Sequence, residues 1–437
     1  MSPPELSTLL TCDLGAISRG RSVFTAELSE HLVKGVGWVP ANQSLTPLGG
    51  LAEPNPFGST GDLRLMPDES THATVGAGPG ETPLDLLLCD IVETDGTPWE
   101  CCPRRFLASA LTALRAEAGA QLTSSFEHEF QLLSTEEEAL PFSLEAQRRA
   151  EPFASTLMGA LLEAGVEPER FFAEFAPHQF EIPVAPATGM EAADRAVIMR
   201  EVVREVARRQ GLRASFVPLL DPAAAGNGVH IHMSLSDEEG RPLLHDPARP
   251  GQLSELGGSF AAGVLSHARA LTAVCAPSPV SAERLRPHHW SAGALCLAVR
   301  NREALLRIPP LISLAGEDAA GQMRLEYRGA DAAANPYLAL GAIVRAGLEG
   351  IREGLPCPPI LEVDPATLSE EDAERFGVGA LPSSLDGALS ALEQDGTARG
   401  WLGPLLSEAY LSLKRAELSG TAELSLEEAC SRYASIY

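Results

Sequence analysis

The segment Phe126–Phe130, FEHEF, places two carboxylates in a pattern that can do chemistry. It lies within Gln121–Leu133, whose alternation predicts a half-buried strand. Residues two apart in a strand share a face, so Glu127 and Glu129 point one way and the aromatic side chains around them point the other. Neighbouring carboxylates repel each other and favour a shared cation. A single such pair is more often a solvated face, so its meaning depends on the other strands.

Further segments carry charged side chains at comparable positions. FFAEFAPHQFEI is a strand with an Ala-Pro bend, GNGVHIHMS is a glycine-rich turn into a strand, and RLEYR is a strand with three charges on one face. The carboxylates and imidazoles of these segments are Glu174, Glu181, His230, His232 and Glu326, and the nearby guanidinium groups are Arg302, Arg307, Arg324 and Arg328.

This combination predicts a site for divalent cations and phosphate. Each segment alone is weak evidence for such a site, because a lone buried histidine or surface arginine is more often structural. Carboxylates with one imidazole suit Mg²⁺ or Mn²⁺ better than a thiolate-preferring metal. Arginines beside such ions are typical of phosphoryl transfer. The sequence has no GxxxxGK[ST] phosphate loop, so any ATP must be held in another way.

Composition restricts the class of protein. The 437 residues carry 33 Lys+Arg against 59 Asp+Glu, a net charge of −26. This acidity argues against nucleic acid or an anionic membrane as partners. The eight cysteines form no CxxC pair, the N-terminus has no secretion signal, and no apolar run is long enough to span a membrane. We therefore expect free thiols and a cytoplasmic location.

The elements that must position these residues fall into two groups. Residues 1–100 contain strand-like runs at Ser22–Leu28, Val36–Val39, Leu63–Met66 and Leu84–Val92, separated by turns rich in glycine and proline. Residues 101–437 alternate strands and helices, and the helices are predicted at 103–118, 145–165, 191–211 and 336–354. We expect a domain of residues 1–100 followed by a domain of residues 101–437.

At these residues the chain resembles the glutamine synthetase family. The resemblance runs from about Leu63 to the C-terminus, and it is carried by LRLMPDEST, FEHEF, EFAPHQFE, GNGVHIHMSL, VRNREALLRIP and RLEYRGADAAANPYLALGAIVRAGLEGI. It implies an α+β protein, with an N-terminal β-grasp domain and a catalytic domain built on a curved antiparallel sheet flanked by helices. It also implies a homo-oligomer of stacked rings, a dodecamer, with active sites between neighbouring subunits.

The resemblance assigns roles by position. One metal, beside the acceptor carboxylate, is assigned to Glu129, Glu174 and Glu181; a second, on the ATP phosphates, to Glu127, His230 and Glu326. Contacts to the nucleotide are assigned to His232, Ser234 and Arg324. Contacts to the transferring phosphate are assigned to Arg302 and Arg307. Contacts to glutamate are assigned to Arg284, Arg328 and the loop residue Gly226. The implied cofactors are Mg²⁺ or Mn²⁺, two or more per site, with ATP as co-substrate. The implied reaction is attack of the glutamate γ-carboxylate on ATP, followed by attack of an amine on γ-glutamyl phosphate.

The chain departs from the family pattern where ammonium would bind. The acidic flap of the family is replaced by PHHWSA, which puts Trp290 in place of the glutamate, and WVPANQSLTPLGG lacks the aspartate of the N-terminal domain. Ammonium is strongly hydrated and needs nearby carboxylates to hold and deprotonate it. We expect Trp290 to line a pocket for a larger amine and His288 or His289 to accept its proton. The alternative is that Trp290 only packs.

The glycine loop also differs, because Ala225 stands where the family has asparagine. One glutamate contact is therefore in question, and Asn227 is a candidate to replace it.

Three functions remain open from the sequence. The first is an ATP-dependent ligase that joins glutamate to an organic amine. The second is a glutamine synthetase that uses ammonia, and the third is a catalytically inactive relative. The sequence does not identify the amine, and it does not prove that glutamate is the acceptor.

Overall fold

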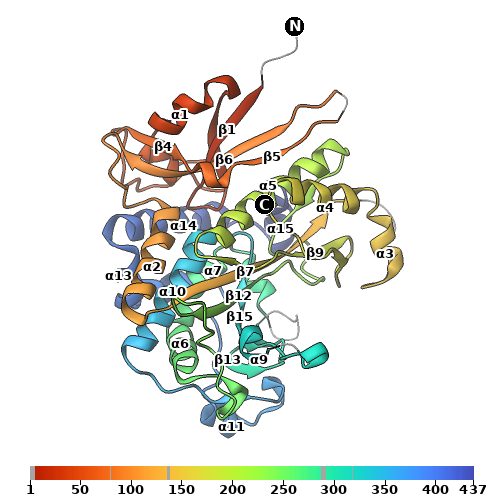
Figure 1. The fold of residues 1–437 in the computed structure, drawn as a ribbon, viewed down its shortest axis with the longest axis vertical. Coiled ribbons are helices and arrows are strands. Elements are labelled where there is room, and N and C mark those ends of the chain that lie inside the picture. Colours follow the sequence, from red (N-terminus) through yellow and green to blue (C-terminus); the bar gives the residue numbers. More distant parts are fainter. Residues whose placement is uncertain (1–4, 79, 135–137, 287–291, 317) are drawn as a thin grey trace.

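The computed structural model describes residues 5–78, 80–134, 138–286, 292–316 and 318–437. These residues form a smaller N-terminal sheet and a larger catalytic sheet. Figure 1 shows the N-terminal sheet in red and orange at the top, above the larger sheet and most of the helices. A single hydrophobic cluster runs through both parts, from Leu9 in the first strand to Tyr437 at the C-terminus.

The N-terminal sheet is mixed. Its strands are β1 (Leu6–Cys12), β2 (Ser18–Phe24), β3 (Val36–Trp38), β4 (Leu63–Pro67), β5 (Ala73–Val75) and β6 (Leu84–Glu93). They lie in the order β2-β1-β6-β4-β3, with β5 paired to β6. The central pair β1 and β6 is parallel and the other pairs are antiparallel. The helix α1 (Leu28–Lys34) packs against β4. The predicted strand at Ser22–Leu28 ends early, because TAEL after Phe24 favours helix over strand.

The catalytic sheet is mainly antiparallel. Its strands are β7 (Gln121–Leu132), β8 (Phe172–Ala173), β9 (Gln179–Pro183), β10 (Ala187–Thr188), β11 (Ala214–Ser215), β12 (Val229–Ser236), β13 (Ala294–Val299), β14 (Ala304–Ile308), β15 (Leu325–Ala330) and β16 (Ile360–Leu361). The order is β16-β13-β14-β15-β12-β7-β9-β8, and β10 and β11 also pair with β7. The predicted α+β fold, a β-grasp domain followed by a sheet flanked by helices, is confirmed.

Helices flank the larger sheet. The first set is α2 (Pro103–Ala118), α3 (Leu144–Arg149), α4 (Phe153–Glu163), α5 (Glu191–Arg209), α6 (Glu255–Ser266), α7 (Ala268–Cys275), α8 (Ser281–Arg284), α9 (Ala319–Gln322) and α10 (Pro336–Arg352). The C-terminal set is α11 (Glu370–Arg375), α12 (Leu385–Gln394), α13 (Gly396–Leu402), α14 (Pro404–Thr421) and α15 (Leu426–Ala434). The helix α5 packs against the central strand β7, and α10 packs against α2 and α6.

Two predicted elements are interrupted in the structure. The helix expected at 145–165 is two helices, α3 and α4, because Pro152 offers no N–H to a continuous helix. The strand expected at Phe171–Ile182 is β8 and β9, separated by a bend at residues 174–178. The bend contains His178 with a φ of 52°, a left-handed conformation that ends a regular strand.

A buried arginine joins the two parts of the chain. Arg104 on α2 donates two hydrogen bonds of 2.9 Å to the carboxylate of Asp194 on α5. It also reaches Asp68, just after β4, at 2.7 Å and Asp90 on β6 at 3.2 Å. Arg104 therefore satisfies three carboxylates, two of them from the N-terminal sheet region.

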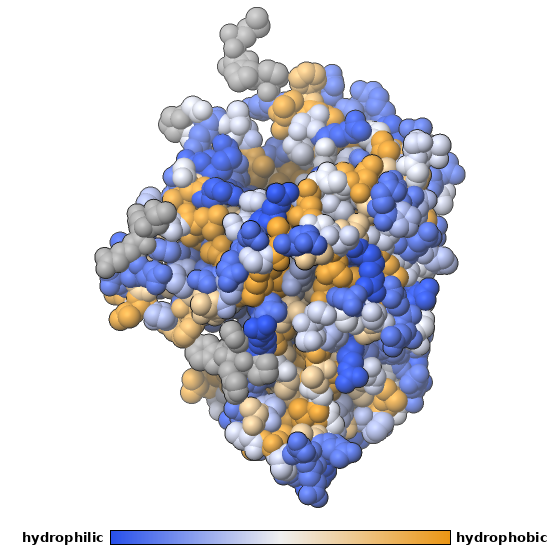
Figure 2. All heavy atoms as spheres, turned by 180° about the vertical axis from the view of Figure 1, so that it is seen from behind, coloured by the Kyte–Doolittle hydropathy of each residue, from blue (hydrophilic) through white to orange (hydrophobic). Residues whose placement is uncertain are grey.

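The surface is mixed in polarity. Hydrophilic and hydrophobic residues are interspersed over the face shown in Figure 2. Among the residues that the structure describes, no helix has the length and apolar character needed to cross a membrane. All eight cysteines are free thiols.

We predict that Arg104→Met lowers the free energy of unfolding by about 3–5 kcal/mol, because its removal leaves the buried carboxylate of Asp194 without its cation. Urea unfolding followed by far-UV circular dichroism measures this change. Arg105→Met is the matched control: Arg105 is 44% exposed and lies 3.6 Å from Asp90, so its loss should change stability by less than about 0.5 kcal/mol. Equal effects of both substitutions would contradict the role given to Arg104.

Candidate active site

The register of the sheet brings the expected metal ligands onto one face. Residues directly opposite each other in an antiparallel pair share a face. Glu127 on β7 is opposite His230 on β12. Glu129 on β7 is opposite Glu181 on β9. Further along the same face, His232 on β12 is opposite Glu326 on β15, which is in turn opposite Arg307 on β14.

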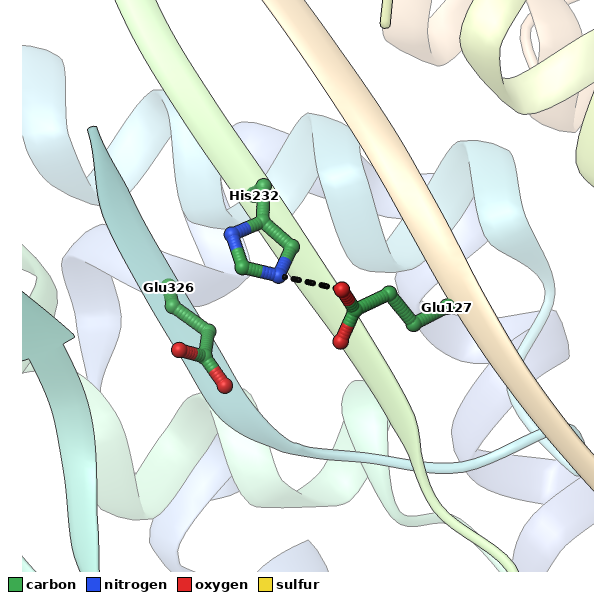
Figure 3. A group of neighbouring side chains, drawn as sticks. All are labelled: Glu127, His232 and Glu326. Atoms are coloured by element: carbon green, nitrogen blue, oxygen red, sulfur yellow. Dashed lines mark ion pairs between the residues drawn. The ribbon is translucent and has the colours of Figure 1, made fainter. Parts of the chain in front are cut away.

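These side chains form two groups. In one group the ligand atoms of Glu127, His232 and Glu326 all lie within 4.8 Å of one another, and in the other the same holds for Glu129, Glu181 and His230. Figure 3 shows the first group: Glu127 and His232 come from neighbouring strands and are joined by an ion pair, and Glu326 lies on the next strand.

The two histidines are grouped differently from the expectation. His230 lies between Glu127 (Nδ1 to Oε2, 3.3 Å) and Glu129 (Nε2 to Oε1, 3.9 Å), so it can serve either group. His232 accepts a hydrogen bond at Nδ1 from Arg324 Nε (3.3 Å), which leaves the ring proton on Nε2, 3.1 Å from Glu127 Oε1. A protonated nitrogen has no lone pair for a metal. The assignment of His232 to the nucleotide therefore stays a prediction that the geometry permits.

Neighbouring positive groups and hydrogen-bond donors keep the carboxylates of Glu127 and Glu326 ionised. Burial alone would raise the pKa of Glu326, but the guanidinium groups of Arg328 and Arg307 are among the charges that lower it to about 2. Arg307 Nη1 donates to Glu326 Oε2 at 2.7 Å, and Arg328 donates to the other oxygen. The pKa of Glu127 is also well below its ordinary value, because His230 and His232 outweigh the effect of burial.

The carboxylates of Glu174 and Glu181 do not have enough positive groups beside them to offset the effect of burial. Burial, and then the charge of Glu129, raise the pKa of Glu174 to about 7. Burial and the carboxylates of Glu127, Glu129 and Glu174 raise the pKa of Glu181 well above its ordinary value. Glu174 comes from the bend between β8 and β9 and interacts with Glu181. Oxygen ligands with raised pKa values fit a divalent cation, which would replace the shared protons.

The remaining predicted arginines occupy distinct positions. Arg328 Nε donates to the backbone oxygen of Arg302 at 3.0 Å, while the Arg302 residue itself is exposed. The positive charge of Arg302 still lowers the pKa of Glu174, against the larger effect of burial. Arg284 is 2% exposed and donates from Nη2 to Ala330 O at 2.8 Å. Ser234 lies two residues beyond His232 on β12 and is half-buried.

The glycine loop at 226–228 fits closely against Arg284. A Cβ on Gly226 would lie 2.2 Å from Pro218 O and 2.7 Å from Arg284 Cγ, so the position requires glycine. The side chain of Asn227 is 1% exposed and bonds to protein groups: Nδ2 donates to Val217 O at 2.8 Å, and Oδ1 accepts from Gln179 at 2.9 Å. Asn227 therefore anchors the loop, and the suggestion that it replaces the missing glutamate contact is not supported.

Three predicted residues lie outside the part of the chain that the structure describes, and two contacts of the site were not predicted. Trp290, His288 and His289 lie outside the described residues, so their expected roles stay predictions. Gln131 and Gln179 both contact residues of the site, but neutral amides have no spacing pattern that would single them out in the sequence.

Comparison with known proteins identifies the family. Residues 1–99 match the glutamine synthetase N-terminal domain, and residues 100–432 match the glutamine synthetase catalytic domain. This chain belongs to the glutamine synthetase family. Family members are ATP-dependent ligases that form carbon–nitrogen bonds and use divalent metal ions, so the predicted enzyme class is confirmed. The relatives also support formation of γ-glutamyl amides as the reaction class.

Individual relatives include ligases with different names. The "Gamma-glutamylpolyamine synthetase GlnA3" of Streptomyces coelicolor is 34% identical over 422 residues, which cover 94% of this chain and 89% of that protein. The glutamine synthetase of Methanocaldococcus jannaschii is 31% identical and covers 82% of this chain and 79% of its own length. Among solved structures, a "novel glutamine synthase homolog" is 46% identical with a TM-score of 0.93, covering 100% and 99% of the two chains. The apo form of GmaS is 28% identical with a TM-score of 0.82, covering 97% and 95%.

We predict that Mn²⁺ raises the melting temperature more at about pH 8 than at about pH 6. In the metal-free protein the raised pKa of Glu174 favours its protonated form, and this contribution to stability is lost as the pH rises through about 7. A cation binds the ionised form, so its stabilising effect grows over the same interval. Thermal unfolding with and without Mn²⁺ measures the difference.

Two variants check this prediction. Glu174→Gln should reduce the pH dependence of the Mn²⁺ effect, because an amide does not exchange a proton, and Glu181, whose pKa is also raised, should account for the remainder. Glu169→Gln changes a carboxylate that is 40% exposed and pairs with Arg170, so it should leave the pH dependence unchanged. A pH-independent Mn²⁺ effect in the unmodified protein would contradict the prediction.

Proposed function

We propose that this protein is a glutamate–amine ligase, which uses ATP to join the γ-carboxylate of glutamate to an organic amine in preference to ammonia. The observation that carries the choice of an organic amine is an apolar rim beside Glu174. This rim consists of Phe142 and Phe175, whose rings lie 6.4 Å apart and which are 55% and 47% exposed.

The rim is attached directly to a proposed metal ligand. The N–H of Phe142 donates to Glu174 O at 3.4 Å, and the N–H of Phe175 donates to Glu174 Oε2 at 3.2 Å. Exposed phenyl rings cannot replace the water around an ammonium ion, but they can pack against the carbon chain of an amine and attract its positive charge. The rim therefore supports an amine that carries methylene groups, a description that includes both alkylamines and polyamines.

The sequence supports the same choice. Trp290 replaces the acidic residue of the flap, and the segment from Trp38 to Gly50 contains no aspartate or glutamate. The name of the Streptomyces coelicolor relative, a γ-glutamylpolyamine synthetase, also agrees with an organic amine.

The residues of the site suit both steps of the reaction. In the first step a γ-carboxylate oxygen of glutamate attacks the γ-phosphorus of ATP, and ADP leaves. We assign Arg302 and Arg307 to the charge that spreads over the transferring phosphoryl oxygens, and Arg284 and Arg328 with Gly226 to glutamate. In the second step the amine nitrogen attacks the acyl carbon, phosphate leaves, and the amine gives up a proton. We assign that proton to His289.

Divalent cations, Mg²⁺ or Mn²⁺, would supply charge neutralisation for the phosphates and the γ-carboxylate. We assign one to Glu129, Glu174 and Glu181 and another to Glu127, His230 and Glu326. His232, Ser234 and Arg324 are then available to the nucleotide.

We further propose that the protein forms a ring-shaped homo-oligomer, a dodecamer, in which neighbouring subunits complete each site, and that residues 1–100 and 101–437 are its two domains. The free thiols agree with a cytoplasmic location.

We predict that phosphate release from Mg²⁺-ATP and glutamate is fastest with one organic amine. A panel of ammonium, methylamine, ethylamine, ethanolamine, putrescine, spermidine and benzylamine gives kcat/KM for each, and the best amine should exceed ammonium by at least about tenfold, or 1.4 kcal/mol in transition-state binding. Ammonium as the best nucleophile would instead identify a glutamine synthetase. Absence of turnover with every amine would refute the proposed function.

The rim can be tested with the preferred amine. Phe142→Ser should raise KM for that amine while KM for ATP stays nearly unchanged, because the lost contact is apolar and local. The matched control is Leu424→Ser, since Leu424 is 38% exposed on the C-terminal part of the chain. Equal KM values for the amine in Phe142→Ser and the unmodified enzyme would contradict the role of the rim.

We predict that the active species has a mass that is a multiple of the 46.2 kDa chain. Light scattering coupled to size exclusion measures the mass, and dilution should reduce specific activity as subunits separate. A fully active monomer would contradict a site shared between subunits.

A further inference from the structure

Gln179 lies within the site although its side chain carries no charge. It is the first residue of β9 and is opposite Gln131 on β7, just as Glu181 is opposite Glu129. Because residues two apart in a strand share a face, the amide of Gln179 lies beside Glu181 on the face of the carboxylates. The residue is 3% exposed.

The amide of Gln179 contacts three segments that are separate in the sequence. Its Oε1 accepts a hydrogen bond from the N–H of Ala176, in the bend that carries Glu174, at 2.8 Å. Its Nε2 lies 2.9 Å from Gly226 O, 2.9 Å from Asn227 Oδ1 and 3.3 Å from Glu129 Oε2. An amide has two N–H groups, so these acceptors share them. One side chain thus joins the bend, β7 and the glycine loop.

Two more buried amides reinforce these contacts. Asn227 Nδ2 donates to Gln131 Oε1 at 3.2 Å, and Gln131 Nε2 donates to Pro177 O in the bend at 2.9 Å. Each amide oxygen and each amide nitrogen of Gln131, Gln179 and Asn227 has at least one hydrogen-bond partner. A fully satisfied buried network of this kind rigidifies the segments that it connects.

The glycine loop is also bonded directly to Glu129. The N–H of Gly228 donates to Glu129 Oε2 at 2.7 Å, and the N–H of Glu129 donates to Gly228 O at 3.1 Å. Arg284 also packs against the loop, where Gly226 leaves no room for a Cβ. A shift of the loop therefore displaces the Glu129 carboxylate, and a shift of that carboxylate displaces the loop.

We propose that Gln179 is a positioning residue that couples the cation held by Glu129 and Glu174 to the glutamate held by Gly226 and Arg284. The inference rests on the proposed function, which assigns these residues to the two ligands. Each ligand orders the segments that the amide joins, so each favours binding of the other, and this coupling is reciprocal.

The test is a Mn²⁺ titration that requires no turnover. Free Mn²⁺ is followed by electron paramagnetic resonance, with and without glutamate, in the full-length protein and in Gln179→Met, which keeps the length of the side chain and removes its amide. In the unmodified protein glutamate should tighten Mn²⁺ binding by at least about fivefold. In Gln179→Met this ratio should fall by at least about twofold, because only the direct bonds between Gly228 and Glu129 then link the two ligands. KM for glutamate should rise about fivefold or more, while KM for ATP stays within about twofold.

Two further variants accompany the measurement. Gln131→Met removes the neighbouring amide, which lies on β7, and should partly reduce the tightening of Mn²⁺ binding by glutamate. This variant therefore reports on the network even where Gln179→Met folds poorly. Gln210→Met changes a half-buried glutamine at the C-terminal end of α5 and should keep the full ratio.

Several results would overturn the inference. It is wrong if Gln179→Met retains the ratio of the unmodified protein, or if glutamate has no effect on Mn²⁺ binding in the unmodified protein. It is also wrong if affinity for Mn²⁺, glutamate and ATP weakens equally together with a lower melting temperature, which would indicate a purely structural role. Failure of the proposed function is distinguished by the amine panel, in which the unmodified enzyme would release no phosphate.

Discussion

Repulsion among carboxylates on one face of the catalytic sheet is the constraint on which this structure depends. The register of β7, β9, β12 and β15 places these groups together, and each must be compensated because the strands bury them. For Glu326 the compensation is internal and comes from arginines on the neighbouring strand and on its own strand. For Glu174 and Glu181 the charges with the largest effect are other carboxylates, which raise their pKa values further. The chain therefore compensates the charge of Glu326 itself, and the proposed cations would compensate Glu174 and Glu181.

This asymmetry explains why the neutral amides matter. Ionised carboxylates packed this closely repel one another and strain the strands that carry them. Hydrogen bonds from uncharged donors oppose that repulsion without adding charge, and they remain in place whether or not the carboxylates are protonated. Gln179 and the Gly228 N–H both donate to Glu129 in this way. The position of Glu129 is thus set by groups whose bonding does not change with pH.

The sequence predicted the charged residues of the site better than it predicted their arrangement. Alternation in FEHEF correctly separates the two glutamates of β7 from the buried Phe126 and Phe130. Pairing across strands is a tertiary property, so the position of His230 between Glu127 and Glu129 followed only from the register. Single residues that favour another backbone conformation account for the missed boundaries. Pro152, for example, divides a predicted helix into two. Gln131 was not recognised and Asn227 was given a different role, because amides are compatible with both surface and core.

The cap of α10 has a consequence for how the chain folds. Asn335 accepts from the first N–H groups of the helix and donates from Nδ2 to Cys12 O and Asp13 O, at the end of β1. The partners are 323 and 322 residues apart in the sequence, and contacts between such distant residues form slowly because a very long loop must close. During synthesis the end of β1 emerges long before Asn335 is made. The bonds between the N-terminal sheet and the cap of α10 therefore form late, and a further bond, from the Tyr437 hydroxyl to Gly15 O, has to wait for the last residue.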